Sequence, residues 1–146
     1  MADFLLEMPK AELHLHLEGS VEPETLHELD PAAPLEELRA LYCYADFEDF
    51  LKAFGAVGKR LRTPEDYALI TRRLLERLAA ENVRYAEIIL AAGVVLWKGQ
   101  EFGPIFDAIR EAANSMANGM PSSLRQISTT ASASPVCPNE KSDTTR

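Results

Sequence analysis

The stretch KAELHLHL, residues 10–17, is the part of the chain whose pattern says most about the fold. Apolar and polar side chains alternate strictly along it, which puts Leu13, Leu15 and Leu17 on one side and His14 and His16 on the other. A period of two residues is typical of a β-strand. We therefore expect a strand whose apolar side packs against helices. Its histidine side should face a polar site or solvent.

Helix and strand signals alternate along the chain that follows. A short helix is expected over 22–29, and an apolar stripe with helical spacing over 47–54 predicts another. Thr63, Pro64 and Asp66 form the start of the most clearly marked helix, with an N-cap, a proline at the first position and a loose capping box. The run VRYAEIIL, 83–90, predicts a second strand. This order favours an α/β fold with a parallel sheet, either doubly wound or a barrel.

Composition excludes several classes of partner. The 146 residues carry a formal net charge of -8, whereas binding to a nucleic-acid backbone needs an excess of Lys and Arg. The longest apolar run, 88–97, is about half of the ~20 residues that a membrane-spanning helix needs. The N-terminus lacks the basic segment of a secretory signal, and two distant cysteines indicate no disulfide framework. We therefore expect a soluble, cytoplasmic protein.

The last part of the chain has a different composition. From residue 115 onwards there is no aromatic side chain, and Ser, Thr and Pro are frequent. Such a stretch has few large apolar groups to offset the entropy lost on ordering. We expect the last helix to end near Asn114. Residues 114–146 are then a low-complexity tail, either disordered or the product of a frameshift.

His14 and His16 are the candidates for chemistry. In a strand, residues i and i+2 point to the same side, so their two imidazoles can ligate one metal ion such as zinc. Catalytic zinc usually takes at least three protein ligands, and this pair supplies two. The alternative to metal binding is two histidines on the solvent-exposed face of an edge strand.

A longer stretch, MPKAELHLHLEGSVEPETL at 8–26, resembles the opening of the adenosine deaminase family, which belongs to the metal-dependent amidohydrolases. FEDFLKAF, 47–54, resembles the apolar helix that follows in that family, and the run from Thr63 through NVRYAEIIL resembles its next helix and strand. The resemblance covers residues 4–113. It implies the N-terminal fragment of a (β/α)8 TIM-type barrel, with the first two βα units.

The resemblance also implies a site and a reaction. His14 and His16 would be two ligands of one zinc ion, and Glu18 and Gly19 would contact the substrate. The apolar wall over the substrate would consist of Phe47, Phe50, Leu51 and Phe54. The implied reaction is the hydrolytic deamination of a 6-aminopurine-type substrate, such as adenosine, adenine or aminodeoxyfutalosine. The residues alone leave Glu18 open as an exposed loop carboxylate and the Phe stripe open as ordinary core packing.

The sequence departs from the family pattern in its second half. The family takes its remaining metal ligands and its general acid from later strands, but this sequence has no His after His27. A complete barrel also needs about 250 residues. We expect no catalytic residue here, weak zinc binding and no activity of the chain alone. Two other functions remain open: one half of a split deaminase that needs a complementing chain, or a non-catalytic purine-binding module.

Overall fold

The computed structural model describes residues 2–119 and 126–132. Its elements are, in chain order, α1 (Ala2–Glu7), β1 (Lys10–His16), the 3-10 turn η1 (Glu18–Ser20), α2 (Pro23–Leu29), α3 (Leu35–Ala40), α4 (Phe47–Arg60), α5 (Pro64–Ala80), β2 (Val83–Ala91), α6 (Ala92–Trp97), α7 (Phe102–Gly119) and β3 (Gln126–Ser132). Within these ranges, no helix has the length and apolar character needed to cross a membrane.

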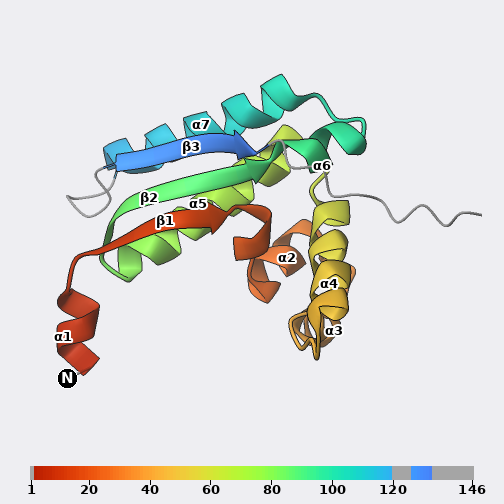
Figure 1. Ribbon diagram of the computed structural model, residues 1–146, viewed down its shortest axis with the longest axis horizontal. Helices are drawn as coiled ribbons and strands as arrows, with labels where there is room; N and C mark the ends of the chain where they lie inside the picture. The colour runs from red at the N-terminus through yellow and green to blue at the C-terminus, as the bar shows by residue number, and fades with distance from the viewer. Residues whose placement is uncertain (1, 120–125, 133–146) are drawn as a thin grey trace, which may run out of the picture.

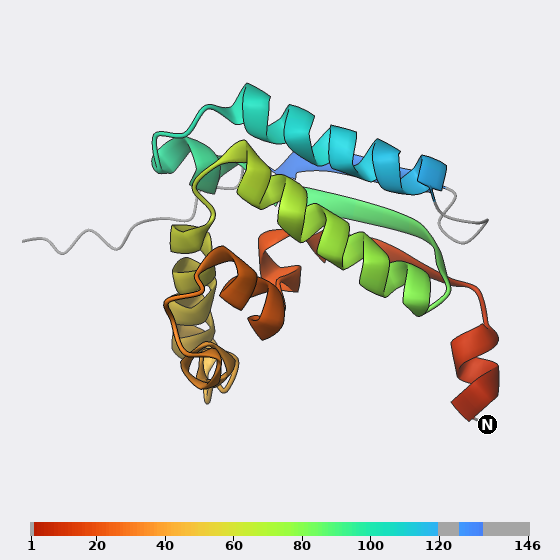
Figure 2. The same ribbon diagram turned by 180° about the vertical axis from the view of Figure 1, so that it is seen from behind.

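The three strands form one parallel sheet in the order β1-β2-β3 (Figure 1). Helices α5 and α7 cover one face of the sheet, as Figure 2 shows, and no helix of the described residues covers the other face. The helices α2, α3 and α4 lie beyond the C-terminal end of β1. This arrangement confirms the predicted α/β class with a parallel sheet and is consistent with the first part of a barrel.

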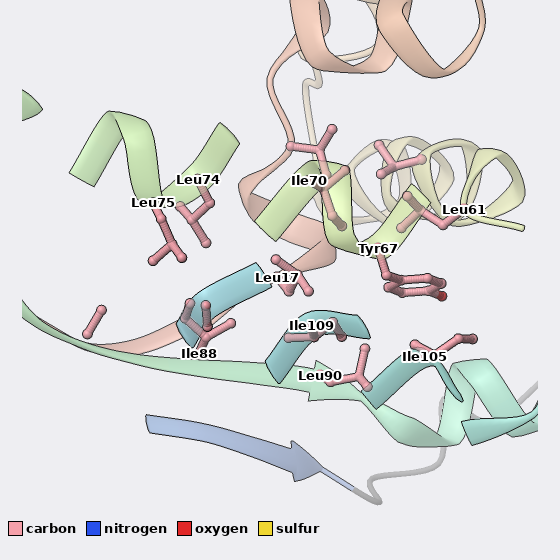
Figure 3. Packing of buried hydrophobic residues seen from close by; sticks show 14 of the residues in the cluster. Leu17, Leu61, Tyr67, Ile70, Leu74, Leu75, Ile88, Leu90, Ile105 and Ile109 are labelled. Carbon is pink, nitrogen blue, oxygen red and sulfur yellow. The ribbon is translucent and has the colours of Figure 1, made fainter. Parts of the chain in front are cut away.

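The core lies between the sheet and its two covering helices. The apolar stripe of α5 points toward the sheet, where Leu75 lies near Ile88 of β2 and Tyr67 lies near Ile105 of α7 (Figure 3). All of these side chains are almost fully buried. Burial of aliphatic and aromatic groups is the main favourable contribution to folding. This layer therefore fixes the positions of the strands, at whose ends the candidate site lies.

The N-terminus of α5 has the capping interactions that its sequence predicts. The backbone N–H of Asp66 donates to Thr63 Oγ1 at 3.3 Å, and the N–H of Thr63 donates to Asp66 Oδ2 at 2.8 Å. Pro64 occupies the first turn, where it removes an N–H that would have had no partner. The capping box is therefore confirmed with both of its hydrogen bonds.

The tail differs from its expectation where the structure describes it. Helix α7 continues to Gly119, beyond the predicted end near Asn114, and residues 126–132 form β3 instead of disordered chain. The segment QISTTAS contains β-branched residues, and it pairs with the edge of β2 from Tyr85 to Ala91. That edge supplies hydrogen-bonding partners that composition alone cannot reveal. The rest of the predicted tail, 120–125 and 133–146, lies outside the described residues.

Candidate metal and substrate site

His14 and His16 lie side by side at the C-terminal end of β1. Their ring centroids are 5.1 Å apart, the two rings meet edge to face, and both side chains are exposed. His16 pairs with Ile89 of β2, whose neighbours Ile88 and Leu90 are buried. Because side chains alternate between the two faces of a sheet, His16 lies on the face that α5 and α7 leave uncovered.

The strict alternation predicted for β1 is wrong in its first half. The register with β2 shifts between Glu12 and Leu15, so that two residues of β1 stand opposite one residue of β2. Leu13 is 61% exposed and Ala11 is also exposed, whereas Leu17 is 1% exposed in the core. A bulge depends on the partner strand, so the pattern of β1 alone does not predict it. The helix-packed apolar side therefore begins only at Leu15.

Glu18 is buried directly after the histidine pair, in contrast to the alternative of an exposed loop carboxylate. It is 2% exposed, and its Oε1 accepts a hydrogen bond of 3.0 Å from the N–H of Ala91 at the end of β2. Its Oε2 has no hydrogen-bond partner among the described residues. Burial raises the pKa of Glu18 above its ordinary value of 4.5, while its own N–H, the Ala91 N–H and the charge of Lys98 oppose that rise. A buried acceptor without a partner is available to a bound molecule.

The predicted apolar stripe lies on α4 and forms a chain of aromatic contacts. The ring centroids of Phe47 and Phe50 are 5.9 Å apart, and those of Phe50 and Phe54 are 6.3 Å apart. Phe54 reaches η1, because a Cβ added to Gly19 would lie 4.0 Å from Phe54 Cε2 and 3.7 Å from His16 Cβ. Gly19 therefore lies close to both Phe54 of the aromatic stripe and His16 of the histidine pair.

The structure brings most of the predicted site residues together, but not all of them. His16, Gly19 and Phe54 are neighbours, and Glu18 lies in the same segment. Phe47 is 71% exposed and Leu51 is 44% exposed, so these two are not ordinary core residues. One polar residue near the site was missed, namely Lys98, which follows α6 and acts electrostatically on Glu18. Its position near Glu18 depends on tertiary packing, so the residues around Lys98 in the sequence do not predict it.

Comparison with known families decides how this site is interpreted. The family model described as "Adenosine deaminase" matches residues 9–143, which is most of the chain. The chain belongs to the adenosine deaminase family. The expected resemblance is thereby confirmed, and the three-stranded sheet is the corresponding part of a TIM-type barrel.

Relatives within the adenosine deaminase family share the N-terminal region. An adenine deaminase of Cupriavidus metallidurans is 38% identical over 119 residues, covering 77% of this chain and 34% of the relative. An aminodeoxyfutalosine deaminase of Streptomyces avermitilis is 35% identical, covering 77% of this chain and 33% of the relative. A crystal structure of a Burkholderia ambifaria amidohydrolase with bound zinc has a TM-score of 0.72 and 27% identity, covering 86% of this chain and 36% of that structure. The chain thus spans about a third of the length of these relatives.

The donor set of this chain suits part of a zinc site. Two exposed imidazoles, two positions apart on β1, offer nitrogen ligands of the type that zinc prefers. Within 2–119 and 126–132, no group of three or more His, Cys, Asp or Glu side chains could hold a metal ion. The pair therefore fits zinc chemically as a partial site of two ligands.

The burial of Glu18 predicts a pH-dependent stability. Because its pKa is raised in the folded state, the folded chain binds more protons than the unfolded chain above pH 4.5, so this group's contribution to stability falls as the pH rises. We expect Glu18→Gln to raise the free energy of unfolding at pH 7 by on the order of 1 kcal/mol and to flatten its pH dependence. Urea unfolding followed by circular dichroism between pH 4 and pH 8, about the range in which buried carboxyls titrate, measures both.

The matched control for this prediction is Glu101→Gln, because Glu101 is an exposed residue before α7. It should leave the stability and its pH dependence unchanged. A Glu18→Gln variant that is less stable than the parent chain across the whole pH range would contradict the prediction.

Proposed function

We propose that this chain supplies the first strands of a zinc-dependent hydrolase that deaminates a 6-aminopurine-type substrate, with His14 and His16 as two ligands of one zinc ion. The observation that carries the proposal is the pair of imidazoles side by side at the end of β1, with His16 and the aromatic side chain of Phe54 both close to Gly19. Membership of the adenosine deaminase family and the zinc-bound relative support it.

Each residue of the site has a distinct task in this proposal. A zinc ion bound there would supply a nucleophilic hydroxide at neutral pH for attack on the ring carbon that bears the amino group. His14 and His16 would hold the ion through one ring nitrogen each. Glu18 Oε2, which is buried and has no partner in the described part of the chain, accepts a hydrogen bond from the substrate. Phe50 and Phe54 exclude water, with Phe47 and Leu51 at the outer end of the same wall.

The substrate is a small purine-type molecule. Relatives named for adenine and for aminodeoxyfutalosine match the same region, and both names denote molecules with a 6-amino group. His16 and Phe54 both lie close to Gly19, so a substrate bound at the histidine pair would lie beside an aromatic side chain. We propose a cytoplasmic location because the two cysteines lie far apart in the sequence and indicate no disulfide framework.

The chain alone is proposed to be inactive. Two histidines are fewer than the three protein ligands that catalytic zinc usually takes, and the described residues contain no further cluster of ligands. No residue of this sequence takes the position of the family's general acid. Activity therefore requires groups beyond those that this chain supplies.

A split enzyme is the second candidate, and the edge of the sheet favours it. β1 is an edge strand among the described residues, and Leu13 on it is 61% exposed. An edge strand presents unpaired N–H and C=O groups that a strand of another chain can pair with. A complementing chain that carries the remaining barrel strands would cover both. A purely non-catalytic purine-binding module stays a prediction without an observation that favours it.

A chimera tests the proposed function. Residues 4–113 would replace the matching region of the Cupriavidus metallidurans adenine deaminase, and ammonia release from adenine and adenosine would be measured with zinc present. We expect deamination by the chimera and none by the 146-residue chain. His16→Ala in the chimera should abolish it, whereas His27→Ala should not.

Three outcomes would count against parts of this proposal. A folded chimera that binds zinc but does not deaminate either compound would overturn the assigned reaction. Ammonia release by the isolated chain would overturn its proposed inactivity. Mixing the chain with the rest of the relative as a separate polypeptide tests the split enzyme, which requires activity only in the mixture.

A further inference from the structure

The C-terminal end of α4 is held by two side chains from the loop after α6. Lys98 Nζ donates to the carbonyl oxygens of Gly58 at 2.6 Å and Leu61 at 2.5 Å. Gln100 Nε2 donates to the same oxygen of Leu61 at 3.1 Å and to that of Arg62 at 2.8 Å. The last carbonyls of a helix have no partner within the helix and carry a partial negative charge. A partly buried lysine at this place therefore gives a strong, localised contact.

The same loop is tied to the histidine strand at its other end. Ala91, the residue before α6, donates to Glu18 Oε1 at 3.0 Å, and the N–H of Leu17 donates to the carbonyl of Ile89 at 3.0 Å. The six residues of α6 thus lie between a contact with η1 and the contact of Lys98 with α4. The opposite charges of Lys98 and Glu18 also act on one another. One short helix therefore connects the end of β1 with the end of α4.

Other contacts at this end of α4 lead elsewhere. Arg60 Nε forms an ion pair of 2.9 Å with Asp30, which links α4 to α2 and not to the sheet. Arg60 Nη1 and Arg62 Nε donate to the carbonyls of Ala56 and Lys59, which belong to α4 itself. Among the described residues, the direct hydrogen bonds from the segment after β2 to this end of α4 come from Lys98 and Gln100.

We propose that Lys98 is a positioning residue that fixes the end of α4 relative to β2 and β1, and so sets the distance between the aromatic stripe of α4 and His16. The description of α4 as a cover over substrate rests on the proposed function. The positioning itself rests on the hydrogen bonds alone. The hydrogen bonds of Lys98 reach the backbone carbonyls of Gly58 and Leu61, so it acts through the backbone at the end of α4.

Hydrogen–deuterium exchange of the 146-residue chain tests this inference without metal or substrate. We expect Lys98→Met to speed exchange of the amides in the second half of α4 by about tenfold, since two charge-assisted hydrogen bonds are lost. Exchange in α5 and α7 should not change. Lys98→Arg keeps a cationic donor and should restore most of the protection. The matched control is Lys59→Met, which removes an exposed lysine from the same helix end.

The inference is overturned if Lys98→Met exchanges like Lys59→Met in α4. Equal acceleration in α4, α5 and α7 would also overturn it, because that pattern indicates a global loss of stability. Should Lys98→Met fail to fold, Gln100→Leu removes the other donor, and unchanged exchange in α4 would then contradict the inference that this loop fixes the end of α4. None of these results depends on zinc or on deamination, so they leave the chimera experiment as a separate test of function.

Discussion

Replacing His16 with alanine should remove zinc binding from this chain. The parent chain is expected to bind the ion weakly, because only two imidazoles are available and their rings lie 5.1 Å apart on an exposed strand end. Loss of even an indirect partner of a metal ligand typically weakens binding about 10- to 100-fold, so loss of a direct ligand should cost more than about 100-fold. Isothermal titration calorimetry with zinc at neutral pH measures this difference. His14→Ala should have the same effect.

The third histidine provides the control. His27 lies on α2, and its Nδ1 is 3.0 Å from the carbonyl oxygen of Ala33, away from the pair at the end of β1. His27→Ala should therefore leave the zinc affinity unchanged. Equal weakening by all three substitutions would indicate binding to scattered imidazoles and would contradict the proposed pair.

Replacing Leu75 with alanine should destabilise the fold by about 3 kcal/mol, within the range of about 2 to 5 kcal/mol for buried leucines. Leu75 is 0% exposed and points from α5 toward the sheet near Ile88 (Figure 3). Shortening it removes apolar contacts and leaves a cavity that close packing cannot fill. Domains of this size have stabilities of about 5 to 15 kcal/mol, so the loss is a large fraction of the total. Urea unfolding followed by circular dichroism measures it.

Leu96→Ala is the matched substitution for that experiment. Leu96 is also on a helix, but it is 62% exposed, so the same change should shift the free energy of unfolding by less than about 0.5 kcal/mol. Similar losses for both variants would mean that the layer between α5 and the sheet does not carry the stability.

Local patterns predicted the features that depend on neighbouring residues in the sequence. The capping box of Thr63 and Asp66 involves residues three apart, and both of its hydrogen bonds are present. The stripe on α4 follows from helical spacing alone. The pairing of β1 with β2 as parallel strands follows from the strand–helix order, because a parallel connection needs a crossover of this length.

Features that depend on distant residues were not predictable in this way. The burial of Glu18 arises from the end of β2, 73 residues further along the chain, whose Ala91 N–H binds its carboxylate. The position of Lys98 depends on the end of α4, 40 residues earlier at Gly58. Composition described 126–132 as tail, but the free edge of β2 orders it as a strand. In each case the partner is set by tertiary structure and not by local propensity.

The bulge in β1 has a consequence for protein engineering. The extra residue between Glu12 and Leu15 is the point at which the strand changes phase relative to β2. Because side chains alternate along a strand, removal of that residue would exchange the two faces on one side of the bulge. Anyone who transplants the His-x-His segment to another parallel sheet should therefore carry over Glu12 to Leu17 as one unit, together with a host strand in matching register. A graft of the two histidines alone would transfer the ligands without the register shift that directs them away from the core.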